Sequence, residues 1–217
     1  MDVPHLIQTF AIFALPVLFA ITLHEAAHDY VARHFGDMTA FAQGRVSLNP
    51  TRHIDLVGTI LVPLVILVLS GGRFLFGWAK PVPVNYSALR QPKRDMMWVA
   101  AAGPLSNLAM AVGWAVLLKI AVLLPAGFFS TPMAEMAKAG ILVNLVFMFL
   151  NLLPILPLDG GRIAASLLPS RMAWQYARLE PWGLPILLLL LVTNLLDAML
   201  NPLIDLSSSL IEAFVLL

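Results

Sequence analysis

Five apolar segments divide the sequence, and they constrain its fold more than any other feature. They cover residues 6–31, 56–69, 96–124, 133–158 and 182–200. A helix needs about 20 apolar residues to cross the hydrocarbon core of a bilayer, and all but the second segment approach that length. The composition agrees, because only 12% of the residues are charged and 60% are hydrophobic, whereas soluble domains are about one quarter charged. The sequence predicts an integral, multi-pass membrane protein.

The short second segment decides how the chain crosses the membrane. Because it holds 14 residues and includes Pro63, we expect it to re-enter or to lie at the interface. Eleven of the 13 Lys and Arg residues then share one side, which the positive-inside rule makes cytoplasmic. We therefore expect an all-α polytopic fold with about four to six transmembrane helices, four being preferred, and with both termini outside the cytoplasm. The eleven are Arg33, Arg45, Arg52, Arg73, Lys80, Arg90, Lys93, Arg94, Arg162, Arg171 and Arg178.

Two polar connectors, residues 36–55 and 71–95, fall on the predicted cytoplasmic side. Each contains a strand-like fragment, A-F-A-Q-G-R-V-S-L in the first and P-V-P-V-N in the second. The two prolines of the second fragment suit an edge strand, so we expect short β-strand or re-entrant connectors. The length leaves no room for a large soluble module. We expect residues 1–217 to form one transmembrane domain, with 201–217 as an amphipathic C-terminal tail and no removable signal peptide at the N-terminus.

Residues 22–30, T-L-H-E-A-A-H-D-Y, place ionisable groups against the first apolar segment. Such groups cost roughly 2.5–3.5 kcal/mol each near the middle of a bilayer, so they need a partner, a water-filled cavity or a metal. On a helix, H-E-x-x-H places His24 and His28 on one face, where both can hold one zinc ion, with Glu25 as general base. A pair of helix-surface histidines is the alternative, and the apolar surroundings favour the metal.

A third ligand is expected from the end of the fourth segment. The chain has no cysteine, so a metal must be held by nitrogen and oxygen, and a catalytic zinc usually has three protein ligands. Asp159 lies in N-L-L-P-I-L-P-L-D-G-G-R, on the same side as the HEAAH stretch. Pro154 and Pro157 break the helix there, and Gly160 and Gly161 allow close backbone approach. We favour Asp159 as a ligand over a residue that only caps the turn.

Several motifs in order make the sequence resemble the site-2 protease family of intramembrane zinc metalloproteases. They are HEAAH, S-L-N-P-x-x-H-I-D-x-x-G-T, G-W-A-K-P-V-P-V-N, A-A-G-P-L-S-N and N-L-L-P-x-x-P-L-D-G-G-R, within residues 10–182. Tyr86 follows P-V-P-V-N where the family usually has proline, and no PDZ-like or CBS-like domain is present. The chain therefore resembles a minimal form of the family.

The resemblance implies one zinc ion per chain, held by His24, His28 and Asp159, with Glu25 activating the zinc-bound water. It also implies that Asn151 holds the substrate or steadies the developing oxyanion, although an interhelical hydrogen bond would explain this residue equally well. The expected activity is that of an endopeptidase that hydrolyses peptide bonds in or near transmembrane segments. The expected partners are a transmembrane protein or peptide substrate and the lipid bilayer.

Further expectations concern the connectors and the alternatives. The fragment of Pro81, Val82, Pro83, Val84 and Asn85 could bind an unwound substrate by strand addition, or could be a structural loop. His53 could approach the metal or steady a loop, although a solvated loop histidine is favoured.

The net charge of +1 makes nucleic acid an unexpected partner, and no feature of the sequence sets the oligomeric state. We expect a prokaryotic plasma membrane, with the active site towards the cytoplasm. The main alternative function is a catalytically inactive membrane metal-binding or scaffold protein. A zinc transporter is less favoured, because segments three and five carry few polar residues.

Overall fold

A computed structural model of the chain describes residues 3–44 and 83–216, together with positions 47, 49, 61 and 65. Within these residues all regular structure is helical. Four long helices are joined by turns and shorter helices. The long helices are α1 (Val3–His34), α4 (Pro92–Leu123), α5 (Ser130–Asn151) and α9 (Leu195–Leu216). The short elements are α2 (Thr39–Ala42), η3 (Tyr86–Ala88), α6 (Asp159–Leu167), α7 (Ser170–Ala177), η4 (Glu180–Trp182) and α8 (Gly183–Val192).

The four long helices account for the apolar character of the chain. In the described part of the chain, four stretches are long and apolar enough to cross a membrane. The predicted all-α polytopic fold is confirmed. The four stretches are Ile7–His34, Pro92–Leu123, Ser130–Asn151 and Leu195–Val215.

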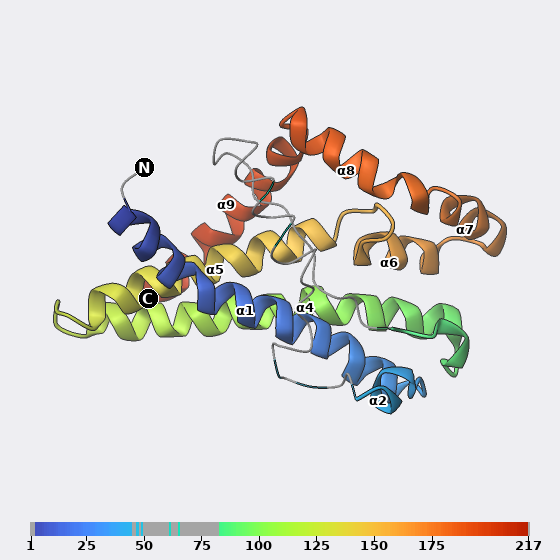
Figure 1. Cartoon of the computed structure of the whole chain (residues 1–217), viewed down its shortest axis with the longest axis horizontal. Helices are drawn as coiled ribbons and strands as arrows, with labels where there is room; N and C mark the ends of the chain where they lie inside the picture. The colour runs from blue at the N-terminus through green and yellow to red at the C-terminus, as the bar shows by residue number, and fades with distance from the viewer. Residues whose placement is uncertain are drawn as a thin grey trace.

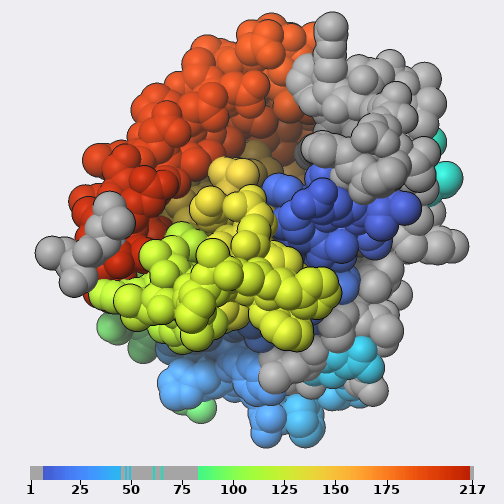
Figure 2. Space-filling model, turned by 90° about the vertical axis from the view of Figure 1, so that its left-hand side faces the viewer, coloured from blue at the N-terminus to red at the C-terminus, as the bar shows by residue number. Residues whose placement is uncertain are grey.

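The helices α4 and α5 form an antiparallel hairpin at the centre of the molecule (Figure 1). Helix α1 lies along this hairpin and contacts both of its members, and α9 packs against α5 and α4. Figure 2 views the end of the molecule where α4 turns into α5, and it shows this connection between the start of α1 and the end of α9. The hairpin therefore separates α1 from α9, and both α1 and α6 pack against α4.

Small residues let the backbones of α1 and α4 approach closely. Along α1, Ala20, His24, His28 and Ala32 are buried at intervals of four residues, which places them on one face. On α4, Gly103 lies against the two imidazoles and the buried Asn107 contacts His24 and Ala20. Small side chains at such positions are typical of packed transmembrane helices. The two histidines of HEAAH consequently face protein rather than lipid.

The chain leaves and rejoins the bundle at one end. The backbone N–H of Arg90 donates to Phe35 O at 3.0 Å, and that of Asn85 donates to the Asp37 carboxylate at 2.7 Å. These contacts join the end of α1 to the approach of α4. The segment 56–69, for which a re-entrant path is expected, lies outside the described residues apart from the single positions 61 and 65.

The strand predicted in the first connector does not form where the structure describes it, and the second fragment is described only in part. Residues 40–42, expected as part of a strand, lie in α2 instead, since the Asp37 carboxylate accepts from the Thr39 N–H at 2.9 Å and turns the chain. No strand forms among the described residues 83–85 of the second fragment either. Pro81 and Val82 lie outside the described residues.

The fifth apolar segment also differs from expectation. In place of a span over 182–200, α8 ends at Val192 and a turn follows, with Asn194 at a φ of +55°. Asparagine adopts this left-handed conformation more readily than most residues. Residues 201–216, expected as an amphipathic tail, are part of α9, which contains the fourth candidate span.

Candidate metal centre

Three of the residues that the sequence proposes as ligands meet at one point. His24 and His28 come from α1, and Asp159 is the first residue of α6. The two Nε2 atoms are 3.1 Å apart. His24 Nε2 lies 3.2 Å from Asp159 Oδ2, and His28 Nε2 lies 3.4 Å from Asp159 Oδ1. All three residues are at most 9% exposed, so the cluster is shielded from bulk water.

The other nitrogen of each imidazole is already used. His28 Nδ1 lies 2.7 Å from the backbone oxygen of Val99, and His24 Nδ1 lies 2.6 Å from Asn107 Oδ1. An oxygen of this kind can only accept a hydrogen bond, so each Nδ1 carries the proton and donates. A neutral imidazole has one donor and one acceptor nitrogen. Both Nε2 atoms therefore present lone pairs towards each other and towards the Asp159 carboxylate.

This arrangement of acceptors suits a cation. Two Nε2 lone pairs and a carboxylate converge, and no hydrogen-bond donor reaches Asp159 Oδ2 among the described residues. Atoms bound at 2.0–2.2 Å around a tetrahedral zinc ion lie about 3.3 Å from one another, and the three separations here are 3.1, 3.2 and 3.4 Å. Two imidazoles and one carboxylate are also a usual donor set for catalytic zinc. The residues present thus fit a zinc ion.

The P-I-L-P-L turn and two glycines bring Asp159 to the site. Helix α5 ends at Asn151, and α6 begins at Asp159 after this turn. A Cβ on Gly161 would lie 2.6 Å from Leu156 N, and one on Gly160 would overlap the backbone of Leu152. Only glycine lets α6 pack this closely beneath the turn. The expected close backbone approach at these two glycines is confirmed.

Gly103 allows a similarly close approach on the opposite side of the cluster. A Cβ at this position would lie 2.5 Å from His24 Cε1 and 2.5 Å from His28 Nε2. Helix α4 therefore covers both imidazoles through its backbone alone. Sequence reasoning recognised the A-A-G-P-L-S-N motif but gave no role to Gly103 or Asn107, which are its third and seventh residues.

Two other predicted catalytic residues lie beside the cluster or at the end of α5. Glu25 is half-buried on α1, close enough to His28 for the two side chains to interact electrostatically. Asn151 is the last residue of α5, and its amide donates to Phe147 O at 3.0 Å, within its own helix. The three-residue cluster does not include Asn151.

The described part of the predicted substrate-binding fragment, residues 83–85, contacts the rest of the protein. Val84 packs against a small cluster that contains Ala32 and Val99. The Asn85 side chain accepts hydrogen bonds from the Ser87 N–H and hydroxyl, so it begins η3. His53 lies outside the described residues.

Tyr86 links the connector to α6. The Arg162 guanidinium lies 5.1 Å from the centre of the Tyr86 ring and 4.0 Å from the Glu180 carboxylate. Arg162 is three residues beyond Asp159 on α6, so this contact supports the helix that carries Asp159. Burial raises the pKa of Tyr86, and the nearby Arg162 acts in the opposite direction.

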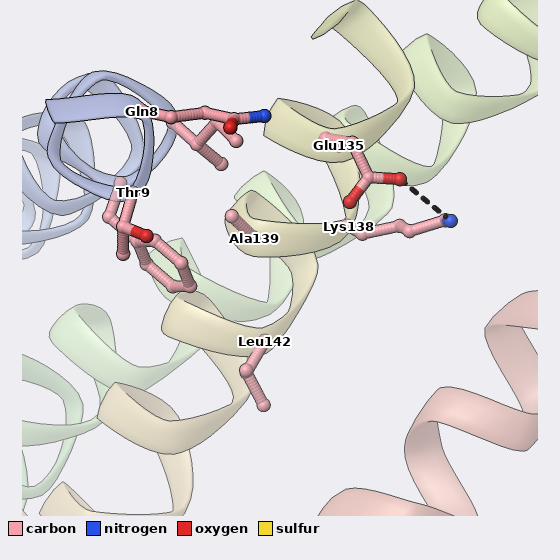
Figure 3. Close-up of a pocket in the computed structure, with 8 residues that line it drawn as sticks. Gln8, Thr9, Glu135, Lys138, Ala139 and Leu142 are labelled. Atoms are coloured by element: carbon pink, nitrogen blue, oxygen red, sulfur yellow. Dashed lines mark hydrogen bonds and ion pairs between the residues drawn. The ribbon is translucent and has the colours of Figure 1, made fainter. Parts of the chain in front are cut away.

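A groove lies far from the cluster of His24, His28 and Asp159. This groove has a volume of about 370 Å³ and lies between Gln8 and Thr9 of α1 and the Glu135–Lys138 ion pair of α5. Figure 3 shows these lining residues. Thr9 precedes His24 by 15 residues, or roughly 22 Å along the helix at 1.5 Å per residue. The groove is therefore separate from the metal cluster. Its lining is completed by Ile12, Phe13, Ala139 and Leu142.

The chain is similar to several bacterial proteins. It is 38% identical over 198 residues to the protein named "Putative zinc metalloprotease YwhC" of Bacillus subtilis, covering 88% of this chain and 84% of that protein. It is 30% identical over 185 residues to "Putative zinc metalloprotease Rip2" of Mycolicibacterium smegmatis, covering 83% of this chain and 66% of the relative. The Rip2 protein of Mycobacterium tuberculosis is 34% identical over 147 residues and is covered over 52% of its length.

No protein-family model matches the sequence, and no solved structure gives a significant match. The similarity to the Bacillus subtilis protein extends over most of both chains. The chain belongs to the family of bacterial zinc metalloproteases that these relatives represent.

Proposed function

We propose that the protein is a zinc-dependent endopeptidase of the site-2 protease type, which hydrolyses peptide bonds in or near transmembrane segments of membrane proteins. The observation that supports this most is the place of the cluster. His24 and His28 lie inside the candidate span Ile7–His34, and His24 is roughly 15 Å from the end of that span at 1.5 Å per residue. A hydrolytic site at this depth reaches peptide bonds that soluble proteases do not.

His24, His28 and Asp159 would hold one zinc ion per chain. Bound there, zinc supplies a Lewis acid that polarises the scissile carbonyl and lowers the pKa of a water molecule to about 7. Glu25 takes the proton from the attacking water and delivers it to the leaving amine, the usual work of a general base and acid. Its position one residue after His24 keeps it beside the ligand pair.

Asn151 is proposed to hold the substrate or the developing oxyanion. A side-chain amide has two N–H donors, and Phe147 O accepts from the Asn151 amide at 3.0 Å. The second N–H would serve the substrate. A positioned donor in a water-poor site stabilises a transition state by roughly 3 kcal/mol, so Asn151→Ala should lower turnover by about a hundredfold while zinc content is unchanged.

The stretch 81–85 is proposed as the place where the unwound substrate pairs with the enzyme. Asn85 N–H is already bonded to Asp37, so pairing would use the backbone groups before it. Replacing Val82 by proline removes one such donor. If cleavage is unchanged in this variant, the stretch is a structural loop instead.

The first experiment is to measure zinc per chain in the purified, detergent-solubilised protein. We expect about one zinc in the wild type and in Glu25→Gln, and less in His24→Ala and Asp159→Ala. Cleavage of a panel of single-span reporter proteins in proteoliposomes should then fail for Glu25→Gln. A Glu25→Gln protein that binds zinc and behaves as the wild type in every assay would indicate the metal-binding scaffold. A folded wild type that takes up no zinc would refute the metal site.

We also propose an orientation of the protein in the membrane. The excess of Lys and Arg on the side of α6, α7 and the connectors favours a cytoplasmic position for that side, in the plasma membrane of a bacterium. Accessibility of a cysteine introduced at Arg171, compared with one introduced at Phe128, tests this in intact cells, because the native chain has no cysteine.

A further inference from the structure

Two buried asparagines extend from the metal cluster into the helix bundle. His24 Nδ1 lies 2.6 Å from Asn107 Oδ1. The Asn107 amide donates to Asn144 Oδ1 at 3.0 Å and to Ala20 O at 3.3 Å. The Asn144 amide in turn donates to Gly140 O at 2.8 Å. Both asparagines are 0% exposed, so water does not replace any of these partners.

The far end of this chain of hydrogen bonds fixes its direction. Gly140 O is a backbone carbonyl and can only accept, so Asn144 must present its NH₂ group to it. Asn144 Oδ1 then faces Asn107 and can only accept a hydrogen bond from its NH₂ group. Ala20 O accepts from the same NH₂ group. Asn107 Oδ1 is thereby turned to His24. Reversing the Asn107 amide would set its oxygen against two other oxygens in a buried site, which is unfavourable.

The orientation of the Asn107 amide sets the position of the proton on His24. Since Asn107 offers an acceptor, His24 carries its proton on Nδ1 and keeps Nε2 as a lone pair. A hydrogen bond to the second nitrogen is the general device by which proteins set the tautomer of a ligating histidine. For His28 a backbone oxygen of Val99 performs this task. For His24 it depends on two side chains from two further spanning helices, α4 and α5.

We propose that Asn107 and Asn144 are positioning residues for the metal, which hold His24 in its metal-binding tautomer and orientation. The inference deepens the proposed function, because it concerns the zinc site stated there. It assigns a role to Asn107, whose contact with His24 is direct. It also assigns one to Asn144, which touches no ligand and acts only through Asn107. Helix α5 thus contributes to the cluster along its length as well as through the turn that follows it.

The test uses the full-length protein in detergent and compares two replacements of Asn107. Asn107→Leu removes the acceptor for His24, whereas Asn107→Asp keeps it. Zinc affinity is measured by competition with a chelator of known affinity. We expect Asn107→Leu to bind zinc about tenfold to a hundredfold more weakly, the usual effect of losing such a partner. Asn107→Asp keeps the acceptor for His24 but sets its other oxygen against Asn144 Oδ1 and Ala20 O, so we expect it to unfold at a lower temperature and yet to lose less zinc affinity than Asn107→Leu. Equal losses in both variants, or no loss in a folded Asn107→Leu, would overturn the proposal.

Asn144→Leu provides a second test that leaves both the ligand and its direct partner in place. It removes one of the two acceptors that orient the Asn107 amide and leaves Ala20 O at 3.3 Å, so we expect a zinc affinity between those of the wild type and Asn107→Leu. Ser130→Ala is the matched control, because Ser130 is a buried polar residue of α5 whose hydroxyl bonds to Gly127 and Pro125 at the other end of the helix. Wild-type affinity in Asn144→Leu would remove Asn144 from the proposal.

A readout without metal separates this inference from the proposed function. The ¹⁵N resonances of the His24 imidazole in metal-free protein report which nitrogen carries the proton. We expect Nδ1–H in the wild type and in Asn107→Asp, and a mixture of tautomers in Asn107→Leu and Asn144→Leu. If the asparagines only join helices, the variants unfold at lower temperature but keep the wild-type tautomer. If the wild type binds no zinc yet shows this tautomer pattern, the metal proposal fails and the hydrogen-bond inference stands.

Discussion

A single methyl group at Gly103 should weaken the metal site. A Cβ there would lie 2.5 Å from both His24 Cε1 and His28 Nε2. Ordinary carbon contacts are about 3.5–4.0 Å, so the two rings must retreat by about 1 Å against the Nδ1 hydrogen bonds that hold them. Overpacking of this kind costs about 1–3 kcal/mol. At about 1.4 kcal/mol per factor of ten, Gly103→Ala should lower zinc affinity about fivefold to a hundredfold.

The same helix supplies the control. A Cβ added at Gly113 meets no atom within 4 Å, and alanine is favoured over glycine in a helix by about 1 kcal/mol. Gly113→Ala should therefore keep the wild-type zinc affinity and unfold no earlier than the wild type. Both variants are compared by chelator competition in detergent. The reasoning is refuted if folded Gly103→Ala binds zinc as tightly as Gly113→Ala, since α4 could not then lie against the two imidazoles.

Three further predictions concern stability. A Cβ at Gly183 would overlap the carbonyl oxygen of Leu156, so Gly183→Ala should destabilise the protein by about 1–3 kcal/mol, seen as a lower denaturation midpoint. Burial raises the pKa of Tyr86 above 10.0, so the unfolded phenol ionises first and stability should fall as the pH rises above that value; this decline should be smaller in Tyr86→Phe. Zinc at 100 times its dissociation constant should stabilise the wild type by about 2.7 kcal/mol, with the shift abolished by a chelator and absent in Asp159→Ala.

The cluster of His24, His28 and Asp159 could be predicted because each part of it has a local cause. The helical period alone places His24 and His28 on one face, whatever the rest of the chain does. Asp159 is 131 residues beyond His28 in the sequence, yet the distribution of positive charge put both at one side of the membrane. The glycines after Asp159 indicated close packing there, and the added-Cβ overlaps explain why.

The division of the fifth apolar segment depends on backbone conformation, which hydropathy does not report. The apolar run over 182–200 continues through Thr193 and Asn194 with little change in character, so it predicts one span. In the structure the run is divided by Asn194 in a left-handed conformation, and the Thr193 hydroxyl donates to Leu189 O at 2.7 Å where α8 ends. The two consecutive polar residues were the sign in the sequence that a helix could end there. Their weight is small against the apolar residues on either side.

The supporting residues Gly103, Asn107 and Asn144 could not be assigned from the sequence because their roles depend on how α4 is rotated against α1 and α5. Each nevertheless stands out against its surroundings. Gly103 and Asn107 are one helical turn apart on α4, and Asn144 interrupts an apolar stretch of α5. An amide inside a spanning helix needs a partner, because neither lipid nor water supplies one there. With a metal site already predicted from HEAAH, such an amide has two kinds of partner, another helix or a ligand, and Asn107 contacts both.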